Sequence, residues 1–213
     1  MPEGVKRSYD NSRRQAQVRA TRAKVLEAAR RLLVELGYPA TTMEAISEAA
    51  DTPVPTVYRL FGSKRAVLAA VLDDAFGGDD APVAFVDRPA VQAALAEPDP
   101  GAMLDAFALL AAELLERSSA LQHVLATAAG VDPDASQLLA EIRRQRHRGQ
   151  SRIVAALVAR NALDPSMDPA EAADIVYVLM SPDTYRTFTV DRGWTTEQYR
   201  RWLGRSLRAL LPP

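Results

Sequence analysis

Hydroxyl-bearing and cationic side chains follow one another closely between residues 56 and 64. The segment PTVYRLFGSK (residues 55–64) carries Thr56, Tyr58, Arg59 and Lys64, and it is too polar to be wholly buried. Side chains of these types donate hydrogen bonds to phosphate oxygens, and arginine also pairs with the edge of guanine. The chemistry that this pattern favours is the binding of a nucleic acid.

A helix is expected over about Gln17–Leu36, with Gly37 as its stop. Two short helices joined by a tight turn follow it and are predicted to hold the segment at residues 55–64. Thr41 and Glu44 have the spacing of a capping box, which predicts that a helix begins there. A second helix is expected over about Pro53–Leu60 with Thr52 as its N-cap, and Ser63 is expected to cap the helix after it. A helix-turn-helix of this kind places the start of its second helix against base edges.

The expected DNA contacts differ along this motif. Short side chains in the first turn of the second helix allow the helix to approach the DNA closely, so that they can touch thymine methyl groups or bond a base. Longer side chains can reach a phosphate or the edge of a guanine. Helix N-termini also favour phosphate. The residues predicted to contact DNA are Val54, Pro55, Thr56, Tyr58 and Arg59 in the second helix, with Thr42 and Lys64 at the starts of its neighbours.

Helical periodicity continues through the rest of the chain, and no segment shows a strong strand pattern. The fold is therefore predicted to be all-α, with an N-terminal three-helix DNA-binding domain and a helical C-terminal domain. We expect a flexible basic arm over residues 1–16, a helix-turn-helix domain over 17–77 and a second domain over 78–213. Its expected helices are Pro89–Ala96, Pro100–Arg117, Ala120–Ala129, Pro133–Ala162, Pro169–Val190 and Thr196–Leu211.

Charge is distributed unevenly, although the net charge of the chain is only −1. Residues 1–31 hold nine lysines and arginines against three acidic residues. A local basic segment can contact phosphates whatever the net charge of the whole protein. The arm at residues 1–16 is therefore either a solvated tail or a contact to phosphates or the minor groove.

Composition argues against several classes of protein. The chain has no cysteine and only two histidines, His123 and His147, which are far apart. We find no motif for a catalytic nucleophile, a phosphate-binding loop or a metal site, so we expect no enzyme activity, no cofactor and no metal. The N-terminal 22 residues lack an apolar segment, and no run approaches the roughly 18 apolar residues of a membrane span. We expect a soluble cytoplasmic protein without a membrane partner.

Residues about 20–72 resemble the DNA-binding domain of the TetR/AcrR family of transcriptional regulators. The resemblance rests on residues 36–38 (LGY), 41–46 (TTMEAI) and 55–64 (PTVYRLFGSK). It implies that Tyr58 and Lys64 contact phosphates and that Thr56 lies in the contact helix. The turn departs from the family pattern, because residues 51–53 read Asp-Thr-Pro where Gly-Val-Ser is common. Asp tolerates a left-handed conformation, so a turn at this place is still expected.

The C-terminal part, from residues 179–183 through the final helix, is similar to the same family in general layout. This resemblance implies a domain that binds a small ligand and forms a dimer through its last two long helices. Apolar and aromatic residues in this part of the chain either line a pocket or pack in the core. For a histidine in an apolar stretch, packing in the core is the more common role. The candidate pocket residues are Met103, Phe107, Leu110, His123, Tyr177 and Met180.

The sequence therefore leads to one main hypothesis and two alternatives. The main hypothesis is a sequence-specific transcriptional regulator, most readily a ligand-responsive repressor, that binds a palindromic operator in double-stranded DNA as a homodimer. A small-molecule effector would control it. The alternatives are a small all-α enzyme, and an interaction or ligand-storage protein with a vestigial helix-turn-helix. An activator would use the same DNA-binding domain as a repressor.

Overall fold

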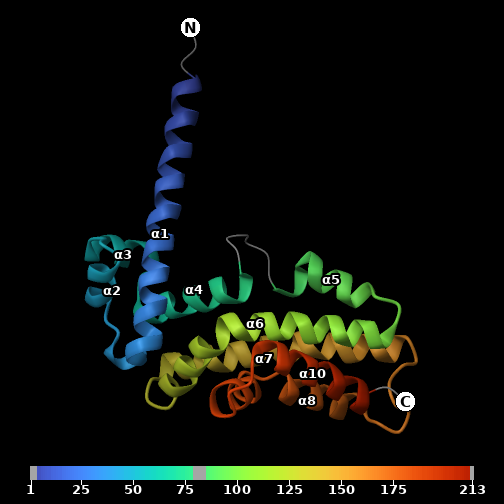
Figure 1. The fold of residues 1–213 in the computed structure, drawn as a ribbon. Coiled ribbons are helices and arrows are strands. Elements are labelled where there is room, and N and C mark those ends of the chain that lie inside the picture. Colours follow the sequence, from blue (N-terminus) through green and yellow to red (C-terminus); the bar gives the residue numbers. More distant parts are fainter. Residues whose placement is uncertain (1–3, 79–84, 212–213) are drawn as a thin grey trace. The chain divides into compact units, whose positions relative to one another are not determined.

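The computed structural model describes the backbone of residues 4–78 and 85–211, and the side chains of residues 12–78 and 85–211. Within these ranges the chain is helical and contains no strand, which confirms the predicted all-α fold (Figure 1). The chain divides into two units, residues 1–72 and residues 73–213. The sequence predicted this boundary after residue 77, where helix α4 (Lys64–Gly77) ends.

The first unit consists of three helices and the beginning of α4. The helices are α1 (Gly4–Ala40), α2 (Met43–Ala49) and α3 (Val54–Phe61). Apolar side chains from each of them meet in a small core that excludes water. This core includes Val25, Leu33, Ile46, Val57, Val67 and Leu68, each at most 1% exposed.

The helix α1 begins well before Gln17, the position at which the sequence predicted it. Residues 4–16, predicted as an arm, are helical in the structure, and the chain has no proline or glycine between Gly4 and Gly37 to end the helix. Arginine, glutamine and alanine are good helix formers, so residues 13–16 extend the helix. At the other end Gly37 has a φ of 77°, which interrupts the helix where the sequence predicted its stop.

The start of α2 lies one residue later than the capping box predicted. Thr42, and not Thr41, is the N-cap, because the Thr42 hydroxyl accepts a hydrogen bond from the backbone N–H of Ala45 at 3.0 Å. The Thr41 side chain is fully buried, and its hydroxyl donates to the Gly37 carbonyl at 2.8 Å. Thr41 therefore holds the link between α1 and α2, and Thr42 remains at the surface.

The turn between α2 and α3 is held by a buried hydrogen bond. The Ser47 hydroxyl donates to the Thr52 carbonyl at 2.6 Å, and the Thr52 N–H donates to the Ser47 carbonyl at 3.0 Å. Asp51 has a φ of 45°, so it adopts the left-handed conformation that the sequence predicted. The predicted N-cap at Thr52 is wrong, because Thr52 is buried and its hydroxyl donates to the Ala50 carbonyl. Pro53 takes the N-cap position without a side-chain hydrogen bond.

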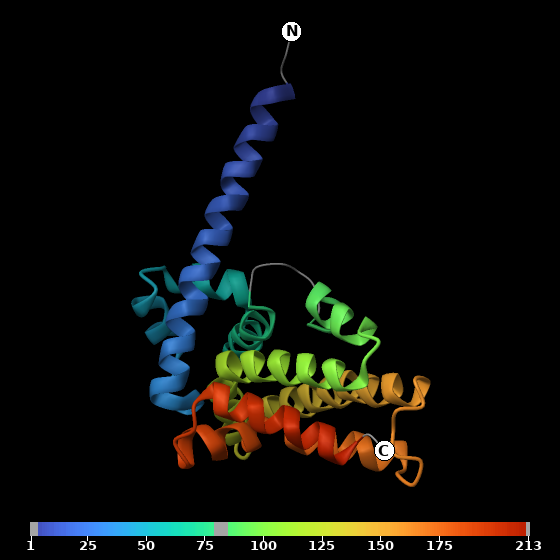
Figure 2. The same ribbon diagram turned by 45° about the vertical axis from the view of Figure 1, so that its right-hand side comes forward.

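The second unit is a bundle around one long helix, α6 (Pro100–Ala128). Helix α10 (Thr196–Leu210) makes its most extensive contact with α6, and α7 (Pro133–Ala159) also packs against it (Figures 1 and 2). In the described part of the chain, no helix combines the length and apolar character that a membrane span needs. The remaining elements are the 3-10 turn η1 (Phe85–Asp87), α5 (Pro89–Ala96), α8 (Pro169–Leu179), α9 (Pro182–Arg186) and the π-helical turn η2 (Thr187–Asp191).

Two predictions of where helices break in the second unit are wrong, and α7 also ends three residues earlier than predicted, at Ala159. Helix α6 continues through residues 118–119, because the Ser118 hydroxyl donates to the Leu114 carbonyl within the helix. The predicted helix Pro169–Val190 instead breaks at Ser181 and Pro182. Proline has no N–H for the helical ladder, and the Ser181 hydroxyl accepts a hydrogen bond from Thr184 N–H to cap a new helix.

We expect Ser47→Ala to destabilise the first unit, because it removes the donor that the buried Thr52 carbonyl uses. An unsatisfied buried acceptor costs about 1–3 kcal/mol. Urea unfolding followed by circular dichroism measures the change. Glu48→Ala, at the exposed neighbouring position, is the control and is expected to have little effect. Equal stability of the two variants would show that the hydrogen bond does not hold the turn.

We expect the second unit to lose stability as the pH rises above about 10. Tyr199 is fully buried, and its hydroxyl donates to the Leu179 carbonyl at 2.8 Å. Burial is the main reason that the pKa of Tyr199 lies well above its ordinary value. The folded state therefore favours the protonated phenol, and its stabilisation is present below the unfolded pKa and disappears at higher pH.

The test compares the wild type with Tyr199→Phe in denaturant unfolding between pH 8 and pH 11. The variant lacks the hydroxyl, so it starts less stable and its stability falls less steeply with pH. The same fall in both proteins would mean that other groups cause the alkaline destabilisation.

Candidate nucleic-acid interface

One face of α3 is buried and the opposite face is exposed. Val57 is fully buried against the first unit, whereas Pro55, Tyr58 and Arg59 are exposed. These three exposed positions have the spacing i, i+3 and i+4, which places them on one side of a helix. Gly62 ends the helix with a φ of 81°, so the exposed stripe is about two turns long.

The polar groups of this stripe are not used by the rest of the structure. Within the part of the chain that the structure describes, the hydroxyls of Thr56 and Tyr58 and the guanidinium of Arg59 make no hydrogen bond or ion pair. Val54 and Thr56 are half-buried at the start of α3. The helix therefore offers free donors beside small side chains, which is the combination that base edges and phosphates can accept.

Lys64 begins α4, and it has a structural partner that the sequence did not indicate. Its ammonium group donates to the Tyr38 carbonyl at 2.9 Å and lies 4.2 Å from the centroid of the Tyr38 ring. A lysine has three N–H donors, so one hydrogen bond to Tyr38 leaves donors for a phosphate. Lys64 thus ties the end of α1 to the start of α4, and its charge stays at the edge of the proposed interface.

A second cation–π contact attaches α3 to α1. The guanidinium carbon of Arg22 lies 4.6 Å from the centroid of the Phe61 ring, at the last residue of α3. Such contacts contribute about 0.5–1 kcal/mol where they are exposed to solvent. Arg22 therefore helps to hold α3. The exposed Arg13, Arg14 and Arg19 lie nearer the N-terminus of α1.

Thr42 is exposed at the N-terminus of α2. Its oxygen accepts the capping hydrogen bond from Ala45, and its hydroxyl proton remains available as a donor. A phosphate oxygen is a suitable acceptor at this place, because the N–H groups of a helix N-terminus also point toward it. The predicted contact residues thus all belong to α2, α3 and the start of α4.

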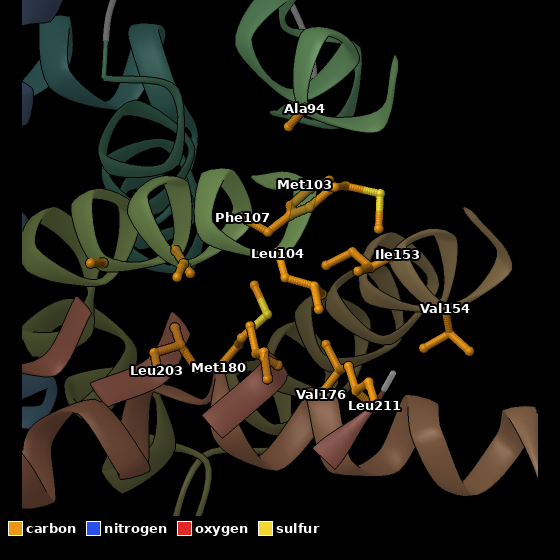
Figure 3. Packing of buried hydrophobic residues seen from close by; sticks show 14 of the residues in the cluster. Ala94, Met103, Leu104, Phe107, Ile153, Val154, Val176, Met180, Leu203 and Leu211 are labelled. Carbon is orange, nitrogen blue, oxygen red and sulfur yellow. The ribbon is translucent and has the colours of Figure 1, made fainter. Parts of the chain in front are cut away.

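The residues predicted to line a ligand pocket separate into two groups in the structure. Met103, Phe107 and Met180 belong to the buried core of the second unit, and Leu110 packs against it (Figure 3). His123 does not belong to this core, because it is exposed on α6. Residues 121, 122, 124 and 125 are the buried ones, so His123 faces the opposite side of the helix.

Tyr177 lies at the contact between α7 and α8, where sequence reasoning missed two polar side chains. The guanidinium carbon of Arg146 lies 3.8 Å from the centroid of the Tyr177 ring. Arg146 Nη1 and Gln150 Oε1 are both buried and have no hydrogen-bond partner. The i, i+4 spacing of Arg146 and Gln150 was the signal in the sequence that these side chains share one side of a helix. The neighbouring arginines instead favoured the interpretation of a solvated face.

Residues 25–71 match the family described as "Bacterial regulatory proteins, tetR family". A curated relative, the "Uncharacterized HTH-type transcriptional regulator YvkB" of Bacillus subtilis (strain 168), is 40% identical over 55 residues. This match covers 26% of the present chain and 29% of that protein. The family match lies within the first unit, and the present chain covers less than a third of the curated relative.

Solved structures resemble the fold of nearly the whole chain. A protein described as a TetR-family transcriptional regulator from Syntrophomonas wolfei has a TM-score of 0.72 and 17% identity, over 90% of this chain and 94% of that one. NalD from Pseudomonas aeruginosa, described as the secondary repressor of the MexAB-OprM multidrug efflux pump, has a TM-score of 0.64 and 19% identity, over 92% and 98%. SmeT in a complex with triclosan has a TM-score of 0.66 and 18% identity, over 91% and 92%.

We expect Lys64→Met to have two separate effects, because Lys64 bonds to Tyr38 and is also predicted to contact a phosphate. The first unit should lose about 1 kcal/mol of unfolding free energy with the hydrogen bond to the Tyr38 carbonyl. The salt dependence of DNA binding should fall by about 0.9 in log–log slope with one lost phosphate contact.

Urea unfolding measures the first effect, and fluorescence anisotropy with a labelled duplex over a salt series measures the second. Arg192→Ala removes an exposed charge from the second unit and is the control for net charge. An unchanged salt slope would refute the phosphate contact, and unchanged stability would refute the structural role.

Proposed function

We propose that this chain, whose residues 25–71 match the tetR family of bacterial regulatory proteins, is a cytoplasmic transcriptional regulator that represses genes by binding an operator. The observation that carries the proposal is the exposed face of α3. Tyr58 and Arg59 lie there with no partner in the described chain, while Val57 anchors the opposite side. A helix that is anchored on one side and polar on the other can enter the major groove.

The expected roles of the contact residues follow from their lengths and positions. Val54, Pro55 and Thr56 allow close approach at the start of α3, and Thr56 is a donor for a base or phosphate. Tyr58, Lys64 and Thr42 are phosphate contacts that set the position of the helix, since phosphate contacts carry no sequence information. Arg59 is the side chain suited to guanine, because its fork matches the O6 and N7 acceptors.

The proposed regulator is a homodimer, and the small size of the proposed DNA-binding surface supports this. One α3 stripe covers only about two turns of helix, which can read a few base pairs. Two copies related by a two-fold axis would read two half-sites of a palindrome, with centres about 34–36 Å apart or a multiple of that distance. The operator proposed for this protein is therefore palindromic.

Repression and control by a small molecule are each supported by one protein that shares the fold. NalD is described as a repressor of an efflux pump, and SmeT forms a complex with triclosan. In the present chain the second unit is the larger part and supplies the effector site in our proposal. An effector releases the operator only if it binds the DNA-free state more tightly than the DNA-bound state.

The deciding experiment selects bound duplexes from a random DNA library with the purified full-length protein at physiological salt. We expect an enriched palindrome, whose half-sites have the spacing given above. Size measurement of the complex by analytical ultracentrifugation should give two protein chains per duplex. Nonspecific, salt-sensitive binding without an enriched sequence would refute the proposal.

We expect Arg59→Ala to change the preference among operator variants as well as the affinity. Loss of a bidentate contact to guanine costs about 1–3 kcal/mol of discrimination at that base pair. Anisotropy titrations on a set of single-base operator variants measure this discrimination. Tyr58→Phe is the matched comparison, because loss of a phosphate contact weakens all variants alike. A uniform loss with Arg59→Ala would mean that Arg59 does not read a base.

A further inference from the structure

One nitrogen of the Arg146 guanidinium is buried in the second unit without a hydrogen-bond acceptor. Arg146 belongs to α7 and is half-buried, with its guanidinium carbon 3.8 Å from the centroid of the Tyr177 ring on α8. Its Nη1 atom is buried and makes no hydrogen bond. Among the residues that the structure describes, no aspartate or glutamate forms an ion pair with Arg146. The aromatic ring therefore supports the charge, but nothing compensates it.

A half-buried charge without a counterion, one of whose nitrogens is fully buried, is unusual in a folded protein. Guanidinium groups keep their proton at every physiological pH, so Arg146 cannot avoid the penalty by becoming neutral. Buried charges are normally paired, and buried polar atoms normally have a hydrogen-bond partner. An unpaired guanidinium in such a place therefore indicates a position kept for an anion that binds from outside the chain.

One turn further along α7, Gln150 presents a second unsatisfied group. The Gln150 residue is 8% exposed, and its Oε1 atom is buried without a donor. Residues at i and i+4 are neighbours on one side of a helix, so Arg146 and Gln150 face the same region. The oxygen and nitrogen of an amide can exchange places by a flip, so Gln150 can either accept or donate a hydrogen bond there.

The other polar groups of this region already have partners. The Tyr199 hydroxyl donates to the Leu179 carbonyl, and the Tyr185 hydroxyl is bonded to the Thr196 hydroxyl at 2.8 Å. Burial is the main cause of the raised pKa of Tyr199, and the positive charge of Arg146 acts in the opposite direction. Both side chains contact α8, Tyr199 at the Leu179 carbonyl and Arg146 at the Tyr177 ring. His147, next to Arg146 in the chain, lies 3.9 Å from the exposed Asp174. None of these three groups therefore bonds to Arg146 or Gln150.

Aromatic side chains line the same part of the bundle. The Tyr199 ring lies 5.0 Å from the Tyr185 ring and 5.7 Å from the Trp202 ring, measured between centroids. Met180 is also buried in this cluster. The surroundings of the unpaired cation are therefore apolar, which suits a ligand with one anionic group and a hydrophobic body.

We propose that the second unit binds a hydrophobic carboxylic acid, with Arg146 holding the carboxylate and Gln150 forming a further hydrogen bond to it. Arginine is suited to this role, because its planar fork pairs with a carboxylate through two parallel hydrogen bonds. The inference rests on the proposed function, in which the second unit carries the effector site. It adds the chemical class of that effector and the residue that recognises it.

The first test measures binding of hydrophobic carboxylates to the full-length protein by isothermal titration calorimetry. The probes are 4-phenylbutyrate and the straight-chain acids from hexanoate to dodecanoate, each compared with its uncharged amide. We expect at least one acid to bind, and its amide to bind about tenfold more weakly or worse. Binding of none of the acids, or equal binding of acid and amide, would overturn the proposal.

Variants then assign the recognition to Arg146. Arg146→Met keeps an unbranched apolar side chain but removes the charge, and Arg144→Met removes an exposed charge from the same helix. We expect the acid to lose about tenfold or more of its affinity in Arg146→Met and to bind Arg144→Met like the wild type. Equal affinity for both variants would exclude Arg146 as the carboxylate site.

The melting temperature of the ligand-free protein gives a readout that does not depend on the probes. Removal of an uncompensated buried charge stabilises a protein, whereas removal of one partner from an internal pair destabilises it. We expect Arg146→Met to raise the melting temperature and Arg144→Met to leave it unchanged. A lower melting temperature of Arg146→Met would mean that Arg146 has an internal partner, such as a bound water, and would overturn the proposal.

Operator binding separates this proposal from the proposed function. Arg146→Met should bind the selected operator like the wild type and should fail to release it when the acid is added. If the added acid releases the operator from the wild type but not from Arg146→Met, both proposals are supported. Carboxylate binding that depends on Arg146, in a protein that selects no DNA sequence, would retain the site and refute the regulator.

Discussion

The packing of a very short helix is the constraint on which the proposed DNA-binding surface depends. An isolated helix of eight residues is not stable in water, so α3 exists only because other elements hold it. Val57 supplies the buried side, and the Ser47 hydroxyl fixes the turn that precedes the helix. Two cations, Arg22 and Lys64, attach the neighbouring segments to aromatic rings. Because these contacts lie behind and beside α3, its exposed polar face is left free for a ligand.

Two neighbouring helices of the second unit, α6 and α7, differ in whether their buried polar groups have partners. In α6 the Ser118 hydroxyl donates to a backbone carbonyl and accepts from the Gln122 amide, so the polar groups within the helix have partners. In α7 Arg146 and Gln150 are left with unsatisfied buried atoms. Unsatisfied groups of this kind reduce stability, and a protein retains them where function requires it. This contrast within one bundle is the reason to connect α7 with ligand binding.

Much of the architecture could be predicted from local signals. Helix α5 has the predicted bounds, and prolines mark the starts of α6, α7 and α8 as expected. The left-handed turn at Asp51 and the stop at Gly37 were also predicted, because both depend on the conformational preferences of one residue. Errors occurred where two neighbouring residues could serve the same purpose. Thr41 and Thr42 can both cap a helix, and only their burial decided that Thr42 does so.

The sequence by itself determined the all-α fold, the helix-turn-helix and the polar stripe of α3, since helical periodicity and capping are properties of neighbouring residues. Tertiary structure alone decided the partners of residues that are distant in the chain. Lys64 meets Tyr38 across 26 positions, and Arg146 meets Tyr177 between two helices. It also placed His123 at the surface and left Arg146 unpaired. These outcomes depend on which helix faces pack together, and that depends on the whole set of side chains in the core.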